Sequence, residues 1–227
     1  MKLNLKSAAL VLALAPGFAM AATTTWKIDS THSSSNFTVK HLVVSEVNGQ
    51  FGKTEGTITL DDKDPSKSSI EATIDATSID TREPKRDAHL KSPDFFDVAK
   101  YPTITFKSTK VAKAGKDKFK VTGDLTMHGV TKPVVLDVTA PAQTVKDPWN
   151  NVKRGAKAVT TLSRHAFDLK WDNKMQDGSA VVGDEVTVTL NLELTQQQPE
   201  AADAAKATDT TKGTAKPATP APATPAK

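Results

Sequence analysis

Apolar and polar residues alternate with a period of two along most of the central part of the chain. The alternation recurs over residues 70–76, 119–125 and 134–138, and in shorter form at 37–41 and 104–106. In the clearest run, near residue 190, the apolar positions are Val186, Val188, Leu190, Leu192 and Leu194, separated by polar residues. A period of two is typical of β-strands that bury one face, so the pattern predicts an all-β protein.

Turn-forming residues separate these runs, among them Asn48-Gly49, Asp64-Pro65 and His128-Gly129. Connections this short favour antiparallel pairing over βαβ units. We expect about eight strands, which is enough for a sandwich or a barrel, and closure as a barrel would remove exposed strand edges. A barrel of this size is filled by its own side chains or holds one small ligand. Small inward residues such as Ala72 and Gly123 leave room for a cavity, although they also fit close packing.

One segment, RDAHLKSPDFFDVAKYP at residues 86–102, breaks the alternation. Pro84 suits the first turn of a helix, and Pro93 ends that helix because the residue before a proline avoids the α region. Ser92 can then cap a second short turn that begins at Pro93. We therefore predict a short helical insertion near residues 84–98, made of two small helices, where a barrel would carry a lid.

The two ends of the chain have a different composition from its centre. Lys2 and Lys6 precede an apolar run that ends near Met20, and a small-x-small site follows, so we expect a signal peptide over residues 1–21, cleaved after Ala21. The alternative is an uncleaved anchor, but the apolar run is short for a membrane span. A cleaved signal would direct the protein to the periplasm. Residues 197–227 are rich in Ala, Pro, Thr and Lys, which predicts a disordered tail. One domain is expected over residues 22–196.

Charge and cysteine content narrow the function. The formal net charge is +4, but the lysines of the expected signal and the tail account for most of it, which leaves about +1 on the predicted domain. This balance argues against an electrostatic nucleic-acid binder. The sequence contains no cysteine, so an ordinary apolar core has to stabilise the fold.

Five blocks of sequence, in this order, resemble the YceI-like family of lipocalin-like periplasmic proteins associated with polyisoprenoid binding. The blocks are DSTHSSSNFTVKHLVVSEVNGQF (29–51), ATSIDT (76–81), RDAHLKSPDFFDVAKYPTITFKST (86–109), GDLTMHGVTKPV (123–134) and VGDEVTVTLNLEL (182–194). The resemblance covers essentially the whole predicted domain. It implies a lipocalin-like antiparallel β-barrel that holds an amphiphile with a long isoprenoid chain, and it implies neither an enzyme nor a cofactor.

The apolar faces of the strands and the insertion supply the candidate lining of that cavity. The candidates are Phe37, Val39, His41, Ile74, Phe95, Phe96, Ile104, Phe106, Phe119, Leu136, Val188 and Leu190. His41 continues the face of Phe37 and Val39, so it either offers a polar contact inside the cavity or marks the end of the strand. Phe95 and Phe96 are adjacent, so we expect one to face the cavity and the other to pack the lid.

The polar head group of such a ligand would stay near the mouth of the barrel. On the helical insertion, Arg86, His89 and Lys91 could bind a phosphate or quinone oxygen there. The alternative is an exposed helical face that carries these charges without a ligand. The sequence indicates no oligomeric state.

Catalysis and metal binding receive little support from the spacing of residues. Asp87 and His89 are two apart and would not face each other on a helix, although a more distant carboxylate could still reach His89. His32 and Ser34 on one strand would lie too far apart for a nucleophile and its base. No pair of histidines has the spacing of metal ligands on a strand or helix, so we predict neither a catalytic nor a metal site.

Two other functions and one further segment stay open. The protein could be a hydrolase or isomerase acting on an amphiphile, or a stress-induced structural protein whose barrel is filled by its own side chains. The segment WNNVKR at residues 149–154 combines an aromatic residue with basic ones, as a sugar or polyanion site would. We favour a solvated hairpin there.

Overall fold

The computed structural model describes residues 23–198, so the expected signal peptide and residues 199–227 of the expected tail lie outside the described residues. Its strands are β1 (Thr24–Ile28), β2 (Ser34–His41), β3 (Ser45–Phe51), β4 (Thr54–Leu60), β5 (Ser69–Asp75), β6 (Ile79–Asp80), β7 (Thr103–Gly115), β8 (Lys118–Met127), β9 (Val130–Thr139), β10 (Val145–Lys146), β11 (Val152–Ser163) and β12 (Val182–Gln196). The helical segments are α1 (Pro84–Lys91) and the short 3-10 turns η1 (Pro65–Lys67), η2 (Ala76–Ser78) and η3 (His165–Phe167).

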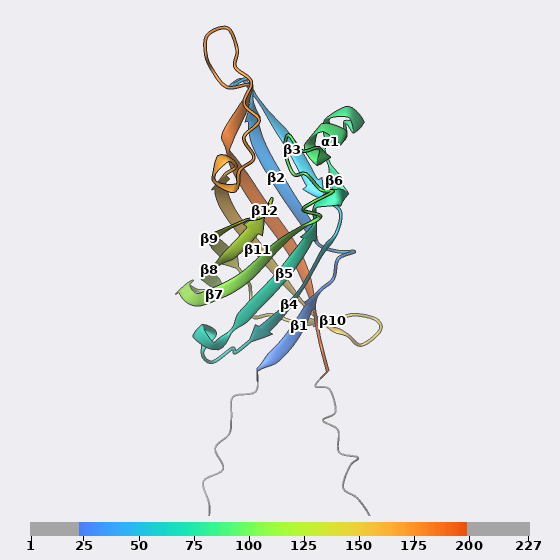
Figure 1. Cartoon of the computed structure of the whole chain (residues 1–227). Helices are drawn as coiled ribbons and strands as arrows, with labels where there is room; N and C mark the ends of the chain where they lie inside the picture. The colour runs from blue at the N-terminus through green and yellow to red at the C-terminus, as the bar shows by residue number, and fades with distance from the viewer. Residues whose placement is uncertain (1–22, 199–227) are drawn as a thin grey trace, which may run out of the picture.

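The strands form one closed antiparallel barrel of eight strands (Figure 1). Three of the eight consist of two segments each, namely β1 with β2, β3 with β4, and β5 with β6. Strand β12 spans the full height of the wall, because its residues 194–196 pair with β1 and its residues 182–191 pair with β2. It also pairs with β11, and β11 pairs with β9, which closes the barrel. The predicted antiparallel barrel is confirmed.

The seam between β9 and β11 is short, since residues 137–139 pair with residues 157–159. Pro133 lies nearer the start of β9, outside the residues that pair with β11. Proline has no backbone N–H to donate to a neighbouring strand, so it suits an unpaired edge. The turn η3 lies beside both strands, and the buried side chains of Phe167 and Leu169 join the main hydrophobic core there. Side-chain packing therefore completes the wall where backbone pairing ends.

The two ends of the barrel carry different elements. We call the end that carries α1 the helix end, and the end where the described chain starts and finishes, beside β1 and β12, the terminal end (Figure 1). The turn between β4 and β5 and the hairpin between β10 and β11 also lie at the terminal end (Figure 1).

The helical insertion is confirmed in its first half and differs in its second. Helix α1 starts at Pro84, and the side chain of the preceding Glu83 accepts a hydrogen bond from the Arg86 amide. The predicted second helix is wrong, because the residues after Pro93 form hydrogen-bonded turns in which Asp97 has a positive φ of 44°. A left-handed residue cannot continue a right-handed helix. Within the described residues, no helix has the length and apolar character needed to cross a bilayer.

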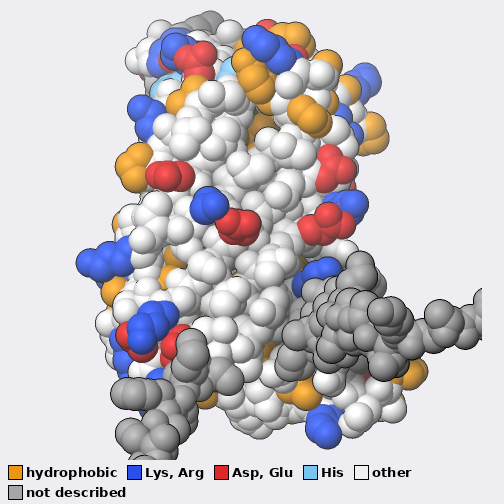
Figure 2. Space-filling model, turned by 60° about the horizontal axis from the view of Figure 1, so that its bottom comes forward, with side chains coloured by type: hydrophobic (Ala, Val, Ile, Leu, Met, Phe, Trp, Pro, Cys, Tyr) orange, Lys and Arg blue, Asp and Glu red, His pale blue; other side chains and the backbone are white. Residues whose placement is uncertain are grey.

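The outer wall carries interspersed charges of both signs. Figure 2 shows Lys and Arg side chains among Asp and Glu side chains on one face, without a continuous basic surface there. Cross-strand ion pairs contribute to this pattern, such as Lys107 Nζ to Glu71 Oε1 at 2.8 Å and Lys120 Nζ to Asp137 Oδ1 at 2.7 Å. This surface agrees with the small net charge predicted for the domain.

Candidate ligand cavity

The barrel encloses an elongated, predominantly apolar cavity of about 580 Å³. Its length can be followed on β12, where Val182, Val186, Val188, Leu190, Leu192 and Leu194 all contribute to the lining. These positions span roughly 40 Å of extended strand. A barrel filled entirely by its own side chains would have no such space, so the cavity argues against that alternative.

Eleven of the twelve lining candidates named from the sequence do line the cavity. The candidates that line the cavity are Phe37, Val39, Ile74, Phe95, Phe96, Ile104, Phe106, Phe119, Leu136, Val188 and Leu190. His41 is not among the lining residues. It is the last residue of β2, where left-handed Leu42 and Val43 turn the chain and the register of β2 with β12 shifts. Of the two interpretations of His41, the structure therefore agrees with the end of the strand.

Aromatic side chains line the cavity at the helix end. Phe95 is 8% exposed and packs against Trp171, with a centroid distance of 5.4 Å, and edge-on against His89 at 5.1 Å. Phe96 packs edge-on against Phe51 at 5.7 Å. Both phenylalanines line the cavity, so the expectation that only one of them faces it was wrong. The two residues lie in the turns after α1, and both rings face the cavity. On a regular strand, adjacent side chains would point to opposite faces.

The sequence-predicted head-group candidates have partners within the protein. Arg86 donates hydrogen bonds from Nε to Thr81 Oγ1 at 2.8 Å and from Nη2 to the Thr81 carbonyl oxygen at 2.9 Å. His89 Nε2 lies 2.9 Å from Asp94 Oδ2, so a carboxylate outside the helix does reach this histidine. Neither Arg86, His89 nor Lys91 belongs to the cavity lining, to which α1 contributes Leu90. Their role toward a ligand stays a prediction.

Charged side chains line the cavity at the terminal end instead. They include Asp61, Asp62, Lys113, Asp117 and Arg154. Arg154 is 7% exposed, donates a hydrogen bond from Nε to the Pro141 carbonyl oxygen at 3.1 Å, and places Nη1 3.3 Å from Asp62 Oδ1. The cavity is therefore mainly apolar along its length, and most of its charged lining residues lie at the end away from α1.

Sequence reasoning missed Arg154 because it assigned residues 149–154 to a polar loop. Only the first part is a hairpin tip, where the Asp147 carboxylate accepts hydrogen bonds from the amides of Trp149 and Asn151, and Trp149 is 81% exposed. Strand β11 begins at Val152, and Arg154 pairs with Leu194 of β12. The alternation Val152, Arg154, Ala156, Ala158 was the available signal, and it places the arginine on the apolar face.

A second buried arginine, Arg164, lines the helix end of the cavity, and backbone carbonyls surround it. Nε donates to Gly183 at 2.9 Å, Nη1 to Leu169 at 2.7 Å and Trp171 at 2.8 Å, and Nη2 to Val182 at 3.2 Å. Burial lowers the pKa of the Arg164 guanidinium. These bonds tie the segment after η3 to the start of β12.

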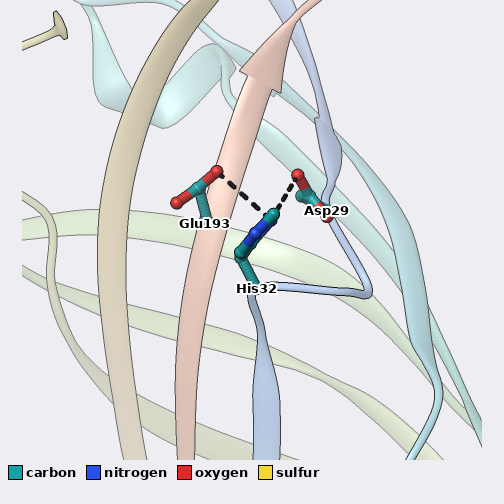
Figure 3. Close-up of side chains that lie close together, drawn as sticks. All are labelled: Asp29, His32 and Glu193. Carbon is teal, nitrogen blue, oxygen red and sulfur yellow. Dashed lines mark hydrogen bonds and ion pairs between the residues drawn. The ribbon is translucent and has the colours of Figure 1, made fainter. Parts of the chain in front are cut away.

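A cluster of ionisable groups lies outside the cavity, where Asp29, His32 and Glu193 meet (Figure 3). His32 Nδ1 is 3.1 Å from Asp29 Oδ2 and 3.8 Å from Glu193 Oε1. Lys153 Nζ already contacts both carboxylates, at 2.9 Å and 3.0 Å. Its hydrogen bond to Asp29 is the main reason that the pKa of Asp29 lies far below its usual range and the pKa of Lys153 is raised. A metal ion would have to displace this ammonium group.

The histidines and serines do not assemble a hydrolytic triad in the part of the chain that the structure describes. Ser163 Oγ and His165 Nδ1 lie 2.9 Å and 3.1 Å from the same oxygen of Asp184, so the carboxylate stands between them. A triad needs the histidine between the serine and the acid. Ser35 Oγ is hydrogen-bonded to Thr54 Oγ1 at 2.6 Å, not to a histidine.

An eight-stranded antiparallel barrel around an apolar cavity defines a lipocalin-like barrel protein. The model of the YceI-like domain matches residues 26–194, and the chain belongs to this family. Protein YceI of Escherichia coli is 39% identical over 189 residues, which cover 82% of this chain and 94% of that protein.

Two solved structures share the fold. The crystal structure of Burkholderia cenocepacia BcnA has a TM-score of 0.64 at 27% identity and covers 73% of this chain and 98% of its own. A polyisoprenoid binding domain from Saccharophagus degradans, implicated in plant cell wall breakdown, has a TM-score of 0.55 at 17% identity, with 76% and 98% covered.

Proposed function

We propose that this protein binds a long-chain polyisoprenoid amphiphile inside the barrel and sequesters or carries it in the periplasm. The elongated apolar cavity is the observation that carries the proposal. Membership of the YceI-like family supports a binding role, and the similar fold of a polyisoprenoid binding domain supports the class of ligand. The expected signal peptide supports the location.

Simple energetics favour a long chain over a short one. Burial of a methylene group stabilises a complex by about 0.8 kcal/mol, so a ten-carbon tail offers roughly 8 kcal/mol. Association itself costs an estimated 4–15 kcal/mol. A tail of several isoprene units exceeds that cost without any strong polar contact, which suits a cavity whose lining is mainly apolar.

Organic extraction of protein purified from the periplasm, followed by mass spectrometry, tests the proposal. We expect an isoprenoid lipid that co-purifies with the folded protein in near-stoichiometric amount. An extract without any isoprenoid, from protein that also fails to bind added isoprenoids, would contradict it. The enzyme alternative predicts a different result, in which His89→Ala abolishes turnover of an amphiphile while ligand binding persists.

A further inference from the structure

Arg154 and Arg164 are both buried and both line the cavity, but they differ in how many of their donors the protein uses. A guanidinium group has five N–H donors. Arg164 directs donors from all three of its nitrogens to four backbone carbonyls. Arg154 uses one N–H on Pro141 and one on Asp62, which leaves three of its five without a partner in the described part of the chain.

Of the two partners of Arg154, Asp62 holds it only loosely. The Nη1–Oδ1 distance to Asp62 is 3.3 Å, and the Asp62 side chain is 67% exposed. The guanidinium carbon also lies 5.9 Å from the ring centroid of Trp26, which packs beneath it in the core of the terminal end. No Arg154 nitrogen is a fully buried atom without a partner, so the unused donors are open to acceptors from another molecule or from water.

Alternation along β11 explains why this charge faces inward. Lys153 points to the outer wall, where it is paired with Asp29 and Glu193. Arg154, the next residue, points to the opposite face and so enters the cavity. Its ion-pair partner Asp62 is largely exposed, and Arg154, which lines the cavity, keeps three N–H donors without a partner in the described residues.

We infer that Arg154 binds an acceptor oxygen of the ligand's polar head group at the terminal end, with the isoprenoid tail directed toward α1. This inference rests on the proposed function and adds the orientation of the ligand to it. A phosphate oxygen and a quinone carbonyl share the required chemistry, since both accept hydrogen bonds from a planar guanidinium.

The neighbouring charges distinguish these two head groups. Asp61 is occupied by the turn after β4, where its Oδ1 accepts hydrogen bonds from the amides of Lys63 and Asp64. Asp62, Asp117 and Lys113 are the other charged groups that line this end. Either head group can use the unoccupied donors of Arg154, but the Asp62 carboxylate repels an anionic head group and hardly affects a neutral carbonyl.

The test compares three probes: geranylgeranyl phosphate, menatetrenone, which has the same tail on a quinone, and squalene, which has no head group. Arg154→Met should weaken binding of a headed probe by about tenfold or more, because a hydrogen bond to a charged group is lost. Squalene binding should change little. Lys91→Met, at the helix end, tests the opposite orientation of the ligand, and the inference predicts that it leaves all three affinities unchanged.

Asp62→Asn separates the two kinds of head group. It should strengthen binding of geranylgeranyl phosphate and leave menatetrenone nearly unaffected, if phosphate is the natural partner of Arg154. If Arg154→Met weakens the binding of menatetrenone alone, the head group that Arg154 binds is a neutral carbonyl.

Three results decide the matter. Unchanged affinity for both headed probes in Arg154→Met, with squalene still bound, would overturn the inference, and so would loss of their binding in Lys91→Met alone. If the wild-type protein binds none of the probes, the proposed function fails instead.

Arg154→Lys is the control for misfolding. It keeps the positive charge but loses the planar arrangement of donors, so it should retain more of the phosphate binding than of the quinone binding.

Discussion

The ring of Phe106 lies against the backbone of Gly123 on the neighbouring strand of the barrel wall. A Cβ atom at Gly123 would be 2.4 Å from Phe106 Cζ and 2.5 Å from the Lys107 carbonyl oxygen. Gly123 itself does not line the cavity, but Phe106 does. The small residue therefore makes room for an aromatic ring in the wall instead of leaving open space for a ligand.

Gly123→Ala should push the Phe106 ring toward the cavity. We expect a loss of about 1–3 kcal/mol in the free energy of unfolding, as for other overpacked sites, together with weaker isoprenoid binding. Chemical denaturation and ligand titration measure the two effects. Gly155→Ala is the control, because a Cβ there meets nothing within 4 Å. Equal behaviour of the two variants would show that Phe106 is free to move.

Arg164→Met should destabilise the fold. It would leave the carbonyl oxygens of Leu169, Trp171, Val182 and Gly183 without their donor. We expect a loss of about 3 kcal/mol or more in the free energy of unfolding. A smaller loss is expected for Arg154→Met, which has fewer partners in the protein. A similar, small effect of both substitutions on the denaturation midpoint would refute this distinction.

The ion pair of Asp29 and Lys153 should make stability sensitive to acid. The pKa of Asp29 is lowered in the folded protein, so its contribution is complete above the unfolded pKa of about 4 and is lost as the pH falls below it. Asp29→Asn should therefore cost about 1 kcal/mol at neutral pH and progressively less in acid. Glu71→Gln, in an exposed pair, should cost almost nothing at either pH. A pH-independent effect of Asp29→Asn would contradict the role of its charge.

Phe95→Ala should open the packing at the helix end. Phe95 is buried between His89 and Trp171, and large-to-small changes of this kind cost about 3–5 kcal/mol. Trp171 should become more accessible to acrylamide, which fluorescence quenching can follow. Unchanged stability and quenching would mean that Phe95 does not hold the aromatic packing at this end together.

The sequence predicted the parts of the structure that depend on local patterns. Alternation along strands such as β12 predicted the barrel and many of the residues that face the cavity, because side chains of a strand point to alternate faces. Pro84 and Pro93 correctly located the ends of α1, because proline restricts the backbone at a helix start and before itself. The five sequence blocks pointed to the family that the domain match confirms.

Features that depend on pairing between distant segments were not predicted. The inward position of Arg154 requires its register opposite Leu194, and the cluster of Asp29 with Glu193 joins residues far apart in the sequence. The helical insertion drew attention to Arg86 and His89, whereas all the charged residues that line the cavity except Arg164 are at the opposite end of the barrel. A local pattern gives the face of a strand, but it does not give the chemistry of an end built from several turns.

Photo-crosslinking gives the most direct test that an isoprenoid chain occupies the cavity. A geranylgeranyl probe with a diazirine in its tail would be bound, irradiated and mapped by peptide mass spectrometry. We predict labelling of inward residues of β12 such as Val188 and Leu190, which excess unlabelled menatetrenone prevents, while their outward neighbours Thr187 and Thr189 stay unlabelled. Labelling of those threonines, or labelling that no competitor reduces, would contradict binding inside the barrel.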